Sequence, residues 1–414
     1  MKGVLRWSTN FGKRALVVAP RTIIVAGAGI GGLTASLALA RQGFRVVVLE
    51  KAERLEEVGA GLQLSPNASR VLVDLGLRPR LSRAVTPEAI SLMNARSGRE
   101  ITRIPLHAAM FDADAPYWVI HRADLQAALQ AEVESCPAID LRLGCQFEDV
   151  SSHAKGLTVV QRRGVTRREE LAMALIGADG IWSAVRGHSF AEVQPRFSGL
   201  IAWRGTLDIT QLPREYTSRR VQLWMGPNAH LVAYPISGAR QINVVAVVPG
   251  QWNRPGWSAP GDGNEIKGAF ASAGWHAIPR MLLGAVDGWQ RWALFGVPGG
   301  GEWTRGATAL LGDAAHAMLP FAAQGAAMAI EDAAVLAKCI AGRQNDGPAA
   351  LAAALKRYAE LRKPRVTRIQ AYARQSGRIY HLTGPLARAR DLVIKALGPK
   401  RMLARQNWIY GWRV

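Results

Sequence analysis

Cysteine, acidic side chains and long apolar runs are all scarce in this chain. The 414 residues include 3 cysteines, and the spacing of Cys136, Cys145 and Cys339 matches no metal-ligand pattern, so we expect no metal site. Few cysteines suit a reducing compartment, and a cytoplasmic protein is expected. No apolar run reaches the ~18 residues that a membrane-spanning helix needs, so no integral membrane segment is expected.

The shortage of acidic residues leaves a large positive charge. The sequence has 31 Asp and Glu against 52 Lys and Arg, a formal net charge of +21, which raises the question of a nucleic acid or an anionic membrane as partner. Residues 351–414 hold fifteen basic and two acidic side chains, and the rest of the excess is scattered. No RNA-binding, zinc or homeodomain pattern accompanies the charge. We expect no nucleic-acid partner and interpret the charge as a solvated basic surface that also attracts anionic substrates and cofactors.

Residues 1–20 lack the apolar core of a secretory signal. Such a core needs ~7–15 residues, whereas the apolar run Ala15–Val18 has four. We expect these residues to be an N-terminal extension outside the fold.

Among the patterns that are present, the first is a strand, a glycine turn, a helix and a second strand. The apolar run Thr22–Ala26 is typical of a buried parallel strand, Ile30–Gln42 is rich in helix formers, and Phe44–Leu49 predicts the next strand. A βαβ unit of about 30 residues is the right length for a crossover connection.

The turn of this unit has the G-x-G-x-x-G spacing of a dinucleotide site. Gly27 permits the tight turn, Gly29 lets backbone N–H groups approach a pyrophosphate, and Gly32 permits close packing of helix on strand. Glu50 follows the second strand, where an acid can bond ribose hydroxyls and disfavours a 2′-phosphate. The motif by itself does not separate FAD from NAD.

The middle of the chain changes to β-rich texture and the end becomes helical and basic. Strand-like segments are Ser198–Asp208, Val221–Met225, Ala229–Ile236 and Gln241–Val248, preceded by a hairpin of Ala89–Asn94 and Glu100–Pro105. Ala307–Leu311 returns to a buried strand, Gln324–Ile340 is helical, and the last 65 residues are predicted to be helices interrupted at Pro364 and at Gly384–Pro385. We therefore expect an α/β fold, with a Rossmann-like domain discontinuous in sequence and an inserted antiparallel β-sheet domain.

These patterns predict seven divisions of the chain. They are an N-terminal extension 1–20, a dinucleotide-binding part 21–87, a hairpin of the substrate domain 88–117, a second dinucleotide-binding part 118–197, a β domain for the substrate 198–293, a third dinucleotide-binding part 294–345, and basic C-terminal helices 346–414.

Two further motifs carry a resemblance. The segment Gly177–Arg186 reads GADGIWSAVR, and residues 310–332 read LLGDAAHAMLPFAAQGAAMAIED. Together with the glycine turn they resemble the FAD-dependent aromatic hydroxylases, the single-component flavoprotein monooxygenases. The resemblance covers about residues 21–375 and is weakest in the β-rich middle and the basic tail. It implies FAD as cofactor, with NADH or NADPH as a transient co-substrate, because the chain has no second G-x-G-x-x-G segment.

The resemblance also implies roles for individual residues. Asp313 would contact the ribityl–pyrophosphate region, and the start of the helix at Gln324–Gly325 would present N–H groups to the pyrimidine end of the flavin. Arg122 would reach the phosphates, although a simple ion pair with Asp124 is an alternative. The full set of expected cofactor contacts is Gly27, Gly29, Ile30, Gly31, Gly32, Glu50, Lys51, Gly61, Arg122, Asp179, Asp313, Pro320, Gly325 and Ala326.

The sequence departs from the wider family in the last motif. Ala323 and Ala327 stand where the family often has Gly and Asn. The version found here, and the segment 57–67 (EVGAGLQLSPN), resemble the subset that acts on salicylate, 3-hydroxybenzoate and 6-hydroxynicotinate.

The expected substrate site centres on the strand Ala229–Ile236. His230, Val232 and Tyr234 alternate onto one face, with the Cα atoms of His230 and Tyr234 about 13 Å apart. A histidine with an ordinary pKa near 6.5 suits the removal of a phenolic proton. The resembling subset carries a histidine and a tyrosine at this spacing, and Gln324 is the third catalytic candidate. The alternative is a satisfied sheet histidine beside a core tyrosine. Arg204 is a candidate partner for a substrate carboxylate or the nicotinamide cofactor, and an exposed ion pair is equally compatible.

The resemblance implies hydroxylation, by O2 and through a flavin C4a-hydroperoxide, of a small phenolic or N-heteroaromatic carboxylic acid. A homodimer is compatible with the sequence. One alternative is a related monooxygenase for a larger polycyclic or antibiotic-like substrate. Another is a basic surface-binding protein with a vestigial flavin fold.

Overall fold

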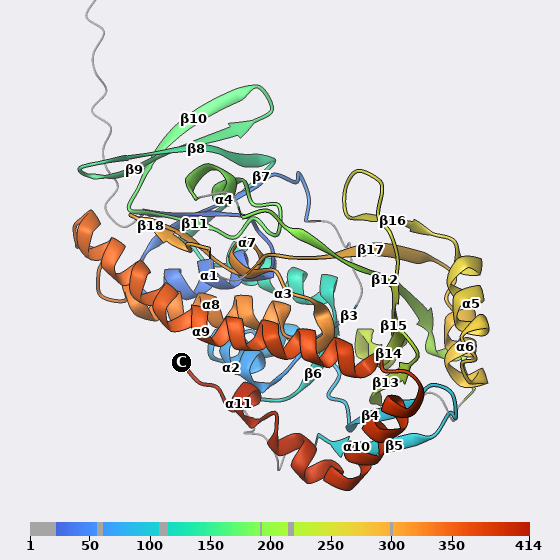
Figure 1. The fold of residues 1–414 in the computed structure, drawn as a ribbon. Coiled ribbons are helices and arrows are strands. Elements are labelled where there is room, and N and C mark those ends of the chain that lie inside the picture. Colours follow the sequence, from blue (N-terminus) through green and yellow to red (C-terminus); the bar gives the residue numbers. More distant parts are fainter. Residues whose placement is uncertain (1–21, 56–60, 107–114, 191–192, 214–218, 299–300) are drawn as a thin grey trace, which may run out of the picture.

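The computed structural model describes residues 22–55, 61–106, 115–190, 193–213, 219–298 and 301–414. Within these ranges the chain forms two large sheets joined by a long helix, α9 (Pro348–Tyr380), which runs across both of them (Figure 1). No helix in these ranges combines the length and the apolar character that a membrane crossing requires.

The first large sheet is parallel and buried. Its strand order is β18 (Thr304–Arg305), β19 (Thr308–Leu310), β11 (Ala174–Gly177), β1 (Thr22–Ala26), β2 (Arg45–Glu50) and β7 (Ile139–Leu143), and only the edge strand β18 is antiparallel. Three segments far apart in sequence therefore contribute to one sheet. The buried strands are near-continuous in apolar residues, as expected for a sheet covered on both faces.

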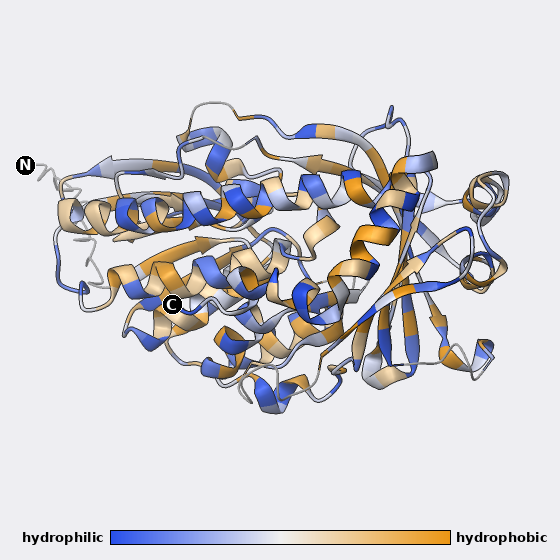
Figure 2. Ribbon diagram, turned by 60° about the horizontal axis from the view of Figure 1, so that its bottom comes forward, coloured by the Kyte–Doolittle hydropathy of each residue, from blue (hydrophilic) through white to orange (hydrophobic). Residues whose placement is uncertain are grey.

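Helices cover this sheet and bring the motifs together. They are α1 (Ile30–Arg41), α2 (Pro66–Asp74), α3 (Arg122–Glu134), α4 (Ala184–Ser189), α7 (Asp313–His316) and α8 (Gly325–Ile340). In Figure 2 the flanking helices alternate hydrophobic and hydrophilic residues, whereas the strands between them are largely hydrophobic. Helix α1 packs on α8 because Gly31 has no side chain: a Cβ there would lie 2.9 Å from Leu311 and 3.1 Å from Ala329. The starts of α1 and α8 consequently lie side by side.

The second large sheet is mostly antiparallel and lies at the other end of the molecule (Figure 1). Its order is β16 (Ser258–Gly261), β17 (Trp289–Gly296), β12 (Arg196–Asp208), β15 (Gln241–Pro249), β14 (Ala229–Ile236), β13 (Arg220–Gly226), β4 (Ala89–Asn94) and β5 (Glu100–Pro105). The hairpin of β4 and β5 forms as predicted, and it joins the sheet through a parallel pairing of β4 with β13.

The two faces of this sheet differ. Leu231, Ala233 and their neighbours pack under α5 (Gly263–Ser272) and α6 (Ala277–Gly284), in a core with four buried tryptophans. The opposite face, called the inner face below, carries His230, Val232 and Tyr234 and looks toward the first large sheet. Two smaller sheets complete the fold: β3 (Gly61–Leu64) with β6 (Trp118–His121), and β8 (Cys145–His153), β9 (Gly156–Arg163) and β10 (Thr166–Ala172).

The C-terminal region differs from its sequence prediction. Pro364 lies inside α9 rather than interrupting a helix, and α9 is continuous over 33 residues. Helix α10 (Gly384–Ala404) follows, broken at Gly398 with φ of 65°, and then α11 (Asn407–Tyr410). Nor is the basic tail purely a solvated surface, because Arg362 is 1% exposed and pairs with buried acids.

Residues 1–20 lie outside the described ranges, and the proposed domain boundaries stay a prediction.

Candidate active site

The glycine turn between β1 and α1 has the geometry that its motif predicts. Gly27 has φ of 104°, and a Cβ there would collide with the carbonyl oxygen of Ala178. A Cβ on Gly32 would collide with the carbonyl of Gly27, so helix and strand pack as closely as the motif requires. Gly29 is different, because a Cβ there would meet nothing within 4 Å. That open position lies directly before the N-terminus of α1, where backbone N–H groups are available to an anion.

Glu50 ends β2 and is tied to the same turn. Its carboxylate accepts hydrogen bonds from the backbone N–H groups of Ala28 (2.8 Å) and Ala52 (2.9 Å). Lys51 follows it and is exposed. The acid is thus fixed beside the glycine turn, at the place where a ribose would lie in a dinucleotide-binding fold.

Arg122 begins α3, close to the glycine turn. One helical turn later, Gln126 donates to the carbonyl of Ala28 (3.4 Å), and side chains four residues apart share a helix face. The pairing with Asp124 does not form, since Asp124 bonds Arg83 at 3.1 Å. In the part of the chain that the structure describes, Arg122 has no ion-pair partner and remains available to a phosphate.

The aspartate–glycine segment, Gly177–Arg186, is hydrogen-bonded within itself and to the Asp313 motif. Asp179 accepts from the hydroxyl of Ser183 (2.5 Å) and from the backbone N–H groups of Ala184 (2.7 Å) and Val185 (3.1 Å), which fixes the start of α4. Burial raises the pKa of Asp179, and these hydrogen bonds oppose the shift. Arg186 donates to the carbonyls of Ala314 and Ile181, at 2.7 Å and 2.5 Å. The segment therefore anchors the Asp313 motif.

The Asp313 motif turns twice through unusual backbone. Gly312 has φ of 61°, and Asp313 follows it as an exposed side chain at the start of α7. Pro320 begins a short 3-10 helix, η6 (Pro320–Ala322), which ends at Ala323 with φ of 52°. This left-handed conformation explains why the family often has glycine where Ala323 stands.

Gln324 and Gly325 come next, with different surroundings. The amide of Gln324 donates to the hydroxyl of Ser65 (2.8 Å) and accepts from the amide of Asn67 (3.0 Å). Ser65 is the N-cap residue of α2, but its side chain bonds Gln324 and Asn67 instead of capping the helix. A Cβ on Gly325 would meet nothing within 4 Å. The hydrogen bonds of the Gln324 amide therefore fix the start of α8. The space next to Gly325 is free, and Ala326 is only half-buried.

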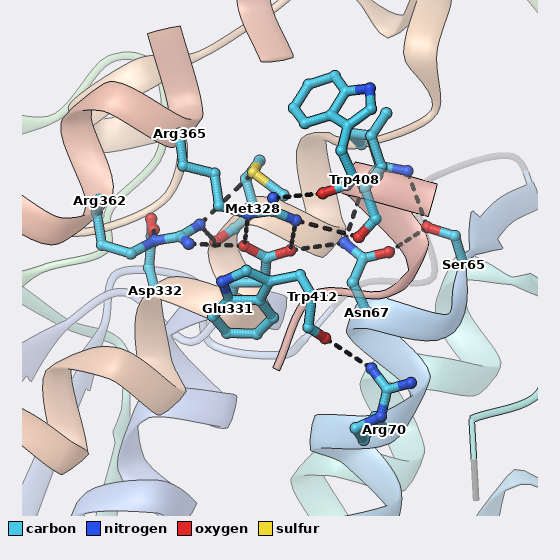
Figure 3. A network of polar contacts seen from close by, with 12 residues as sticks. Ser65, Asn67, Arg70, Met328, Glu331, Asp332, Arg362, Arg365, Trp408 and Trp412 are labelled. Carbon is cyan, nitrogen blue, oxygen red and sulfur yellow. Dashed lines mark hydrogen bonds and ion pairs between the residues drawn. The ribbon is translucent and has the colours of Figure 1, made fainter. Parts of the chain in front are cut away.

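Asn67, a partner of Gln324, belongs to a buried polar network that includes Glu331 and Arg362 (Figure 3). Asn67 donates to Glu331 (2.7 Å), which also accepts from Arg362 (2.6 Å) and Arg365 (2.6 Å). Asp332 pairs with Arg362 (2.6 Å) and with His316 (2.5 Å). Burial alone would raise the pKa of Asp332, but His316 and Arg362 together lower it to about 2. His316 thus orders the motif as a structural residue, and the network fixes α2, α8 and α9 relative to one another.

On the inner face of the second sheet, three polar groups surround an apolar floor. Strand pairing places Val232 beside Val245, and Val245 beside Arg204 on β12. His230 and Tyr234 flank Val232 along β14 and are 3% and 4% exposed. The ring of Tyr234 packs against Gly61, where a Cβ would lie 2.6 Å from it. The predicted pair thus shares a face with Arg204 and abuts β3 of the first half of the chain.

The arginine and the tyrosine of this group form a donor set. Within the described residues, the Nε atom of Arg204 is buried without a hydrogen-bond partner, and its guanidinium lies 5.7 Å above the ring of Trp292. Burial lowers the pKa of Arg204, Tyr234 raises it and Arg122 lowers it, so these three side chains lie within electrostatic reach of one another. Burial also raises the pKa of Tyr234. A retained arginine cation beside a neutral phenol suits an anionic ligand.

His230 has a partner that the sequence did not reveal. Its Nδ1 lies 2.7 Å from Nε2 of His381, the residue that caps the C-terminus of α9. Burial and the neighbouring His381 lower the pKa of His230 well below 6.5, and burial lowers the pKa of His381 to about 4. His230 therefore departs from the ordinary pKa expected from its residue type. The 151 residues between the two histidines left no spacing signal that could have joined them.

The residues at the first sheet fit an FAD. Two adjacent helix starts are open at Gly29 and Gly325, Arg122 lacks a counter-ion in the described chain, and Asp313 is an exposed carboxylate. Small residues with empty space, a free cation and N–H groups at helix ends are the features that accommodate a pyrophosphate and a flavin ring.

Comparisons with known proteins agree with this geometry. The FAD-binding domain family matches residues 21–373. The 3-hydroxybenzoate 6-hydroxylase of Klebsiella oxytoca is 36% identical over 94% of this chain and 96% of its own length. The 3-amino-4-hydroxybenzoate 2-monooxygenase PtnB3 of Streptomyces platensis is 38% identical over 94% of this chain and 96% of its own.

Solved structures show the same fold. A salicylate hydroxylase in complex with substrate has a TM-score of 0.78 and 26% identity, covering 95% of this chain and 96% of that chain. The HpxO protein of Klebsiella pneumoniae, complexed with FAD and uric acid, has a TM-score of 0.77 and 24% identity, covering 95% and 97%. The glycine turn, the aspartate–glycine segment and the Asp313 motif all lie within the matched region, and FAD is the cofactor of this enzyme. This chain belongs to the FAD-dependent aromatic hydroxylases, in the group that resembles the salicylate and 3-hydroxybenzoate enzymes.

Proposed function

We propose that this enzyme hydroxylates a small phenolic carboxylic acid of the hydroxybenzoate type, with NADH or NADPH and O2 as co-substrates. The observation that carries the proposal is the inner face of the second sheet. There Arg204, Tyr234 and His230 surround the floor of Val232 and Val245, and the buried Nε of Arg204 has no partner among the described residues. A cation at one side and a base at the other match a ring with a carboxylate and a hydroxyl.

Each group has a distinct task in this proposal. Arg204 binds the carboxylate, where a charge-assisted hydrogen bond is strong because water is excluded. His230 takes the proton of the ring hydroxyl, because an electron-rich phenolate accepts electrophilic oxygen more readily than a phenol does. Tyr234 stays protonated, since burial raises its pKa, and can donate to an oxygen of the substrate.

The cofactor would be held at the first sheet by the predicted contacts. The pyrophosphate would lie at Gly27–Gly32 with Arg122, the ribose at Glu50, and the ribityl chain near Asp313. Ala326 and Gly325 would adjoin the ring, and Gln324, held by Ser65 and Asn67, would be a positioning residue for this helix start. When bound, FAD supplies the redox chemistry that activates O2, using electrons from the nicotinamide.

The relatives support the substrate class. The two curated relatives above are named for hydroxylation of 3-hydroxybenzoate and of 3-amino-4-hydroxybenzoate, and a structural neighbour for salicylate. All three names describe an aromatic ring with a carboxylate and a hydroxyl, which is the pattern that Arg204 and His230 would recognise.

The test is oxidation of NADH and NADPH by the FAD-loaded protein with salicylate, 3-hydroxybenzoate, 4-hydroxybenzoate and 6-hydroxynicotinate, with product masses. Stimulated oxidation and a product heavier by one oxygen support the proposal. For salicylate, loss of CO2 with the added oxygen does the same. Bound FAD without stimulation by any of the four contradicts it and favours a larger substrate.

A pair of variants distinguishes loss of the carboxylate contact from a general disturbance of the sheet. Arg204→Met should raise KM for a carboxylated substrate by roughly 10- to 100-fold, the loss of one hydrogen bond to a charge. Arg291→Met is the matched control. Arg291 also stacks on a tryptophan of this sheet (Trp203, 5.3 Å) but pairs with Glu265 on the outer side, so its KM should be unchanged. Equal effects of the two variants would contradict the assignment.

A further inference from the structure

His381 occupies a position that the proposed function leaves unexplained. It follows Tyr380 as the C-cap of α9, far from β14 in sequence, and is only partly buried, whereas His230 is 3% exposed. Its backbone carbonyl accepts from the N–H of Asn228, in the turn that precedes β14, at 3.2 Å. The end of α9 is therefore fixed against the same strand that carries His230.

The contact between the rings is specific. The Nδ1 of His230 and the Nε2 of His381 are 2.7 Å apart, so one of the two nitrogens carries the shared proton. Phe321 and Tyr380 enclose the pair, with ring centroids 5.3 Å and 5.5 Å from that of His230. The Nε2 of His230 has no hydrogen-bond partner among the residues that the structure describes.

Among the described residues, no acid contacts the pair, so none would trap a proton there. The strands beside β14 present Met225 and Val247 opposite His230. Tyr380 is the last residue of α9, directly before His381. Its hydroxyl donates to the carbonyl of Phe321 (3.2 Å), and burial raises its pKa. On α10, Arg390 donates to the carbonyl of Tyr380 (3.2 Å) and pairs with Asp391.

Resting on the proposed function, we propose that His381 is the second member of a two-histidine proton relay, which carries the phenolic proton of the substrate from His230 toward the surface. The substrate O–H bond breaks as a proton moves to Nε2 of His230. The proton on Nδ1 of His230 moves to Nε2 of His381, and the proton on Nδ1 of His381 leaves to water. The net change is transfer of one proton from the phenol to solvent, and both rings return to neutrality.

The physical reasons for this direction are burial and exposure. Two neutral rings in contact can each accept one proton and give up another, whereas a histidine beside a carboxylate would keep its proton. The lowered pKa values of both rings keep them neutral at pH 7, so that neither ring carries an extra proton before the substrate binds. His381 is a positioning residue in this arrangement, because it acts on the substrate only through His230.

The experiment compares the FAD-loaded wild type with His381→Leu and His381→Gln. Glutamine is the discriminating variant, since its amide reaches the place of Nε2 and can bond His230 but cannot titrate. The first readout is proton release on binding the best ligand of the hydroxybenzoate panel, measured with an indicator dye in weak buffer. The second is kcat and KM from pH 5.5 to 9. His276→Gln is the control, a half-buried histidine at the start of α6, on the other side of the sheet.

The relay predicts one set of results. Wild type and His276→Gln release about one proton per ligand bound, and both His381 variants release much less. In both variants kcat falls about 10- to 100-fold near neutral pH with little change in KM, consistent with the usual size of acid–base contributions. The loss shrinks as pH rises, because solvent base can then accept the proton.

Other results overturn the relay. If His381→Gln restores kcat and proton release, the residue is merely structural. Unchanged proton release and pH profile in His381→Leu lead to the same conclusion, provided that the variant retains FAD. A wild type that responds to none of the ligands overturns the proposed function and the relay with it, and this outcome is distinct from a responsive wild type with unaffected variants.

Discussion

Two nearly fully buried histidines of this protein have opposite electrostatic surroundings. His316, 2% exposed, lies 2.5 Å from Asp332, which Arg362 also holds. His230, 3% exposed, lies 2.7 Å from another histidine. In the described chain no acid contacts either ring of the second pair. The first site pairs buried charges and fixes three helices relative to one another, whereas the second keeps two rings neutral, as the proposed relay requires. Burial by itself therefore does not determine the role of a histidine. Under the proposed relay, the partner makes His316 a structural residue and His230 a chemical one.

The largest expected effect comes from removing the cation of the first site. Arg362→Met leaves Glu331 and Asp332 buried with reduced compensation, which should cost about 3–5 kcal/mol of unfolding free energy. Chemical denaturation of the FAD-loaded protein measures the loss. Arg357→Met is the control, because the Arg357–Glu360 pair is exposed and 3.7 Å long, and its removal should change little. Equal losses would show that the buried network adds no stability.

A smaller effect separates the two sites by pH. Asp332 has a folded pKa of about 2 against 3.8, so its contribution, roughly 2 kcal/mol, is present above pH 3.8 and is lost as pH falls toward 2. His381 has a folded pKa of about 4 against 6.5, and its contribution is lost in the higher window, from pH 6.5 down to 4. Denaturation midpoints across this range should decline in two steps. His381→Gln should reduce the upper step, to which the lowered pKa of His230 also contributes, and leave the lower step unchanged. Loss of the lower step in that variant would contradict the assignment.

The variant His316→Gln tests whether the two buried histidines have different roles. This change weakens one hydrogen bond to a buried charge, and we expect a loss of about 2 kcal/mol in stability. Because His316 is a structural residue, the pH profile of kcat should keep its shape, in contrast to His381→Gln. An altered pH profile in His316→Gln would mean that the two histidines are not functionally distinct.

The smallest expected effect concerns the enclosure of the second site. Tyr380→Phe removes one hydrogen bond, to the carbonyl of Phe321, while keeping the ring that covers His230. The expected cost is about 1 kcal/mol, with kcat reduced several-fold at most. Thermal melting and steady-state kinetics check both numbers. A loss as large as that of His381→Leu would shift the proposed relay from His381 to the tyrosine.

Local patterns predicted much of the fold. Strands β1 and β14 begin and end at the residues expected from the sequence. Such elements are determined by periodicity and turn residues close in sequence. The three-stranded sheet of β8–β10 and helices α5 and α6 were missed, because their burial patterns are mixed and depend on packing against distant segments. Pro364 was wrongly taken as a break, since tertiary contacts along α9 override the local cost of proline.

The candidate site was predictable only where its residues lie close together in the sequence. The glycine turn and the alternation of His230 with Tyr234 are such cases. Three features depended on long-range contacts instead: the Gln324 amide bonded to Ser65, the buried pairing of Arg362, and the approach of His381. A basic side chain in a basic tail gave no signal that its counter-ions were 30 residues away and buried.

The length of α9 links the two sites in a way that a shorter helix would not. From Arg362, which holds the acids near the first sheet, to Tyr380, which covers His230, there are 18 residues, or about five helical turns and roughly 27 Å. A whole number of turns puts both side chains on the same side of the rod. The length of the helix therefore sets both the distance and the rotation between its two ends. One residue added or removed would rotate the far end by about 100° and turn His381 away from its partner. Substitutions along its exposed side can accumulate freely, but a change in its length cannot.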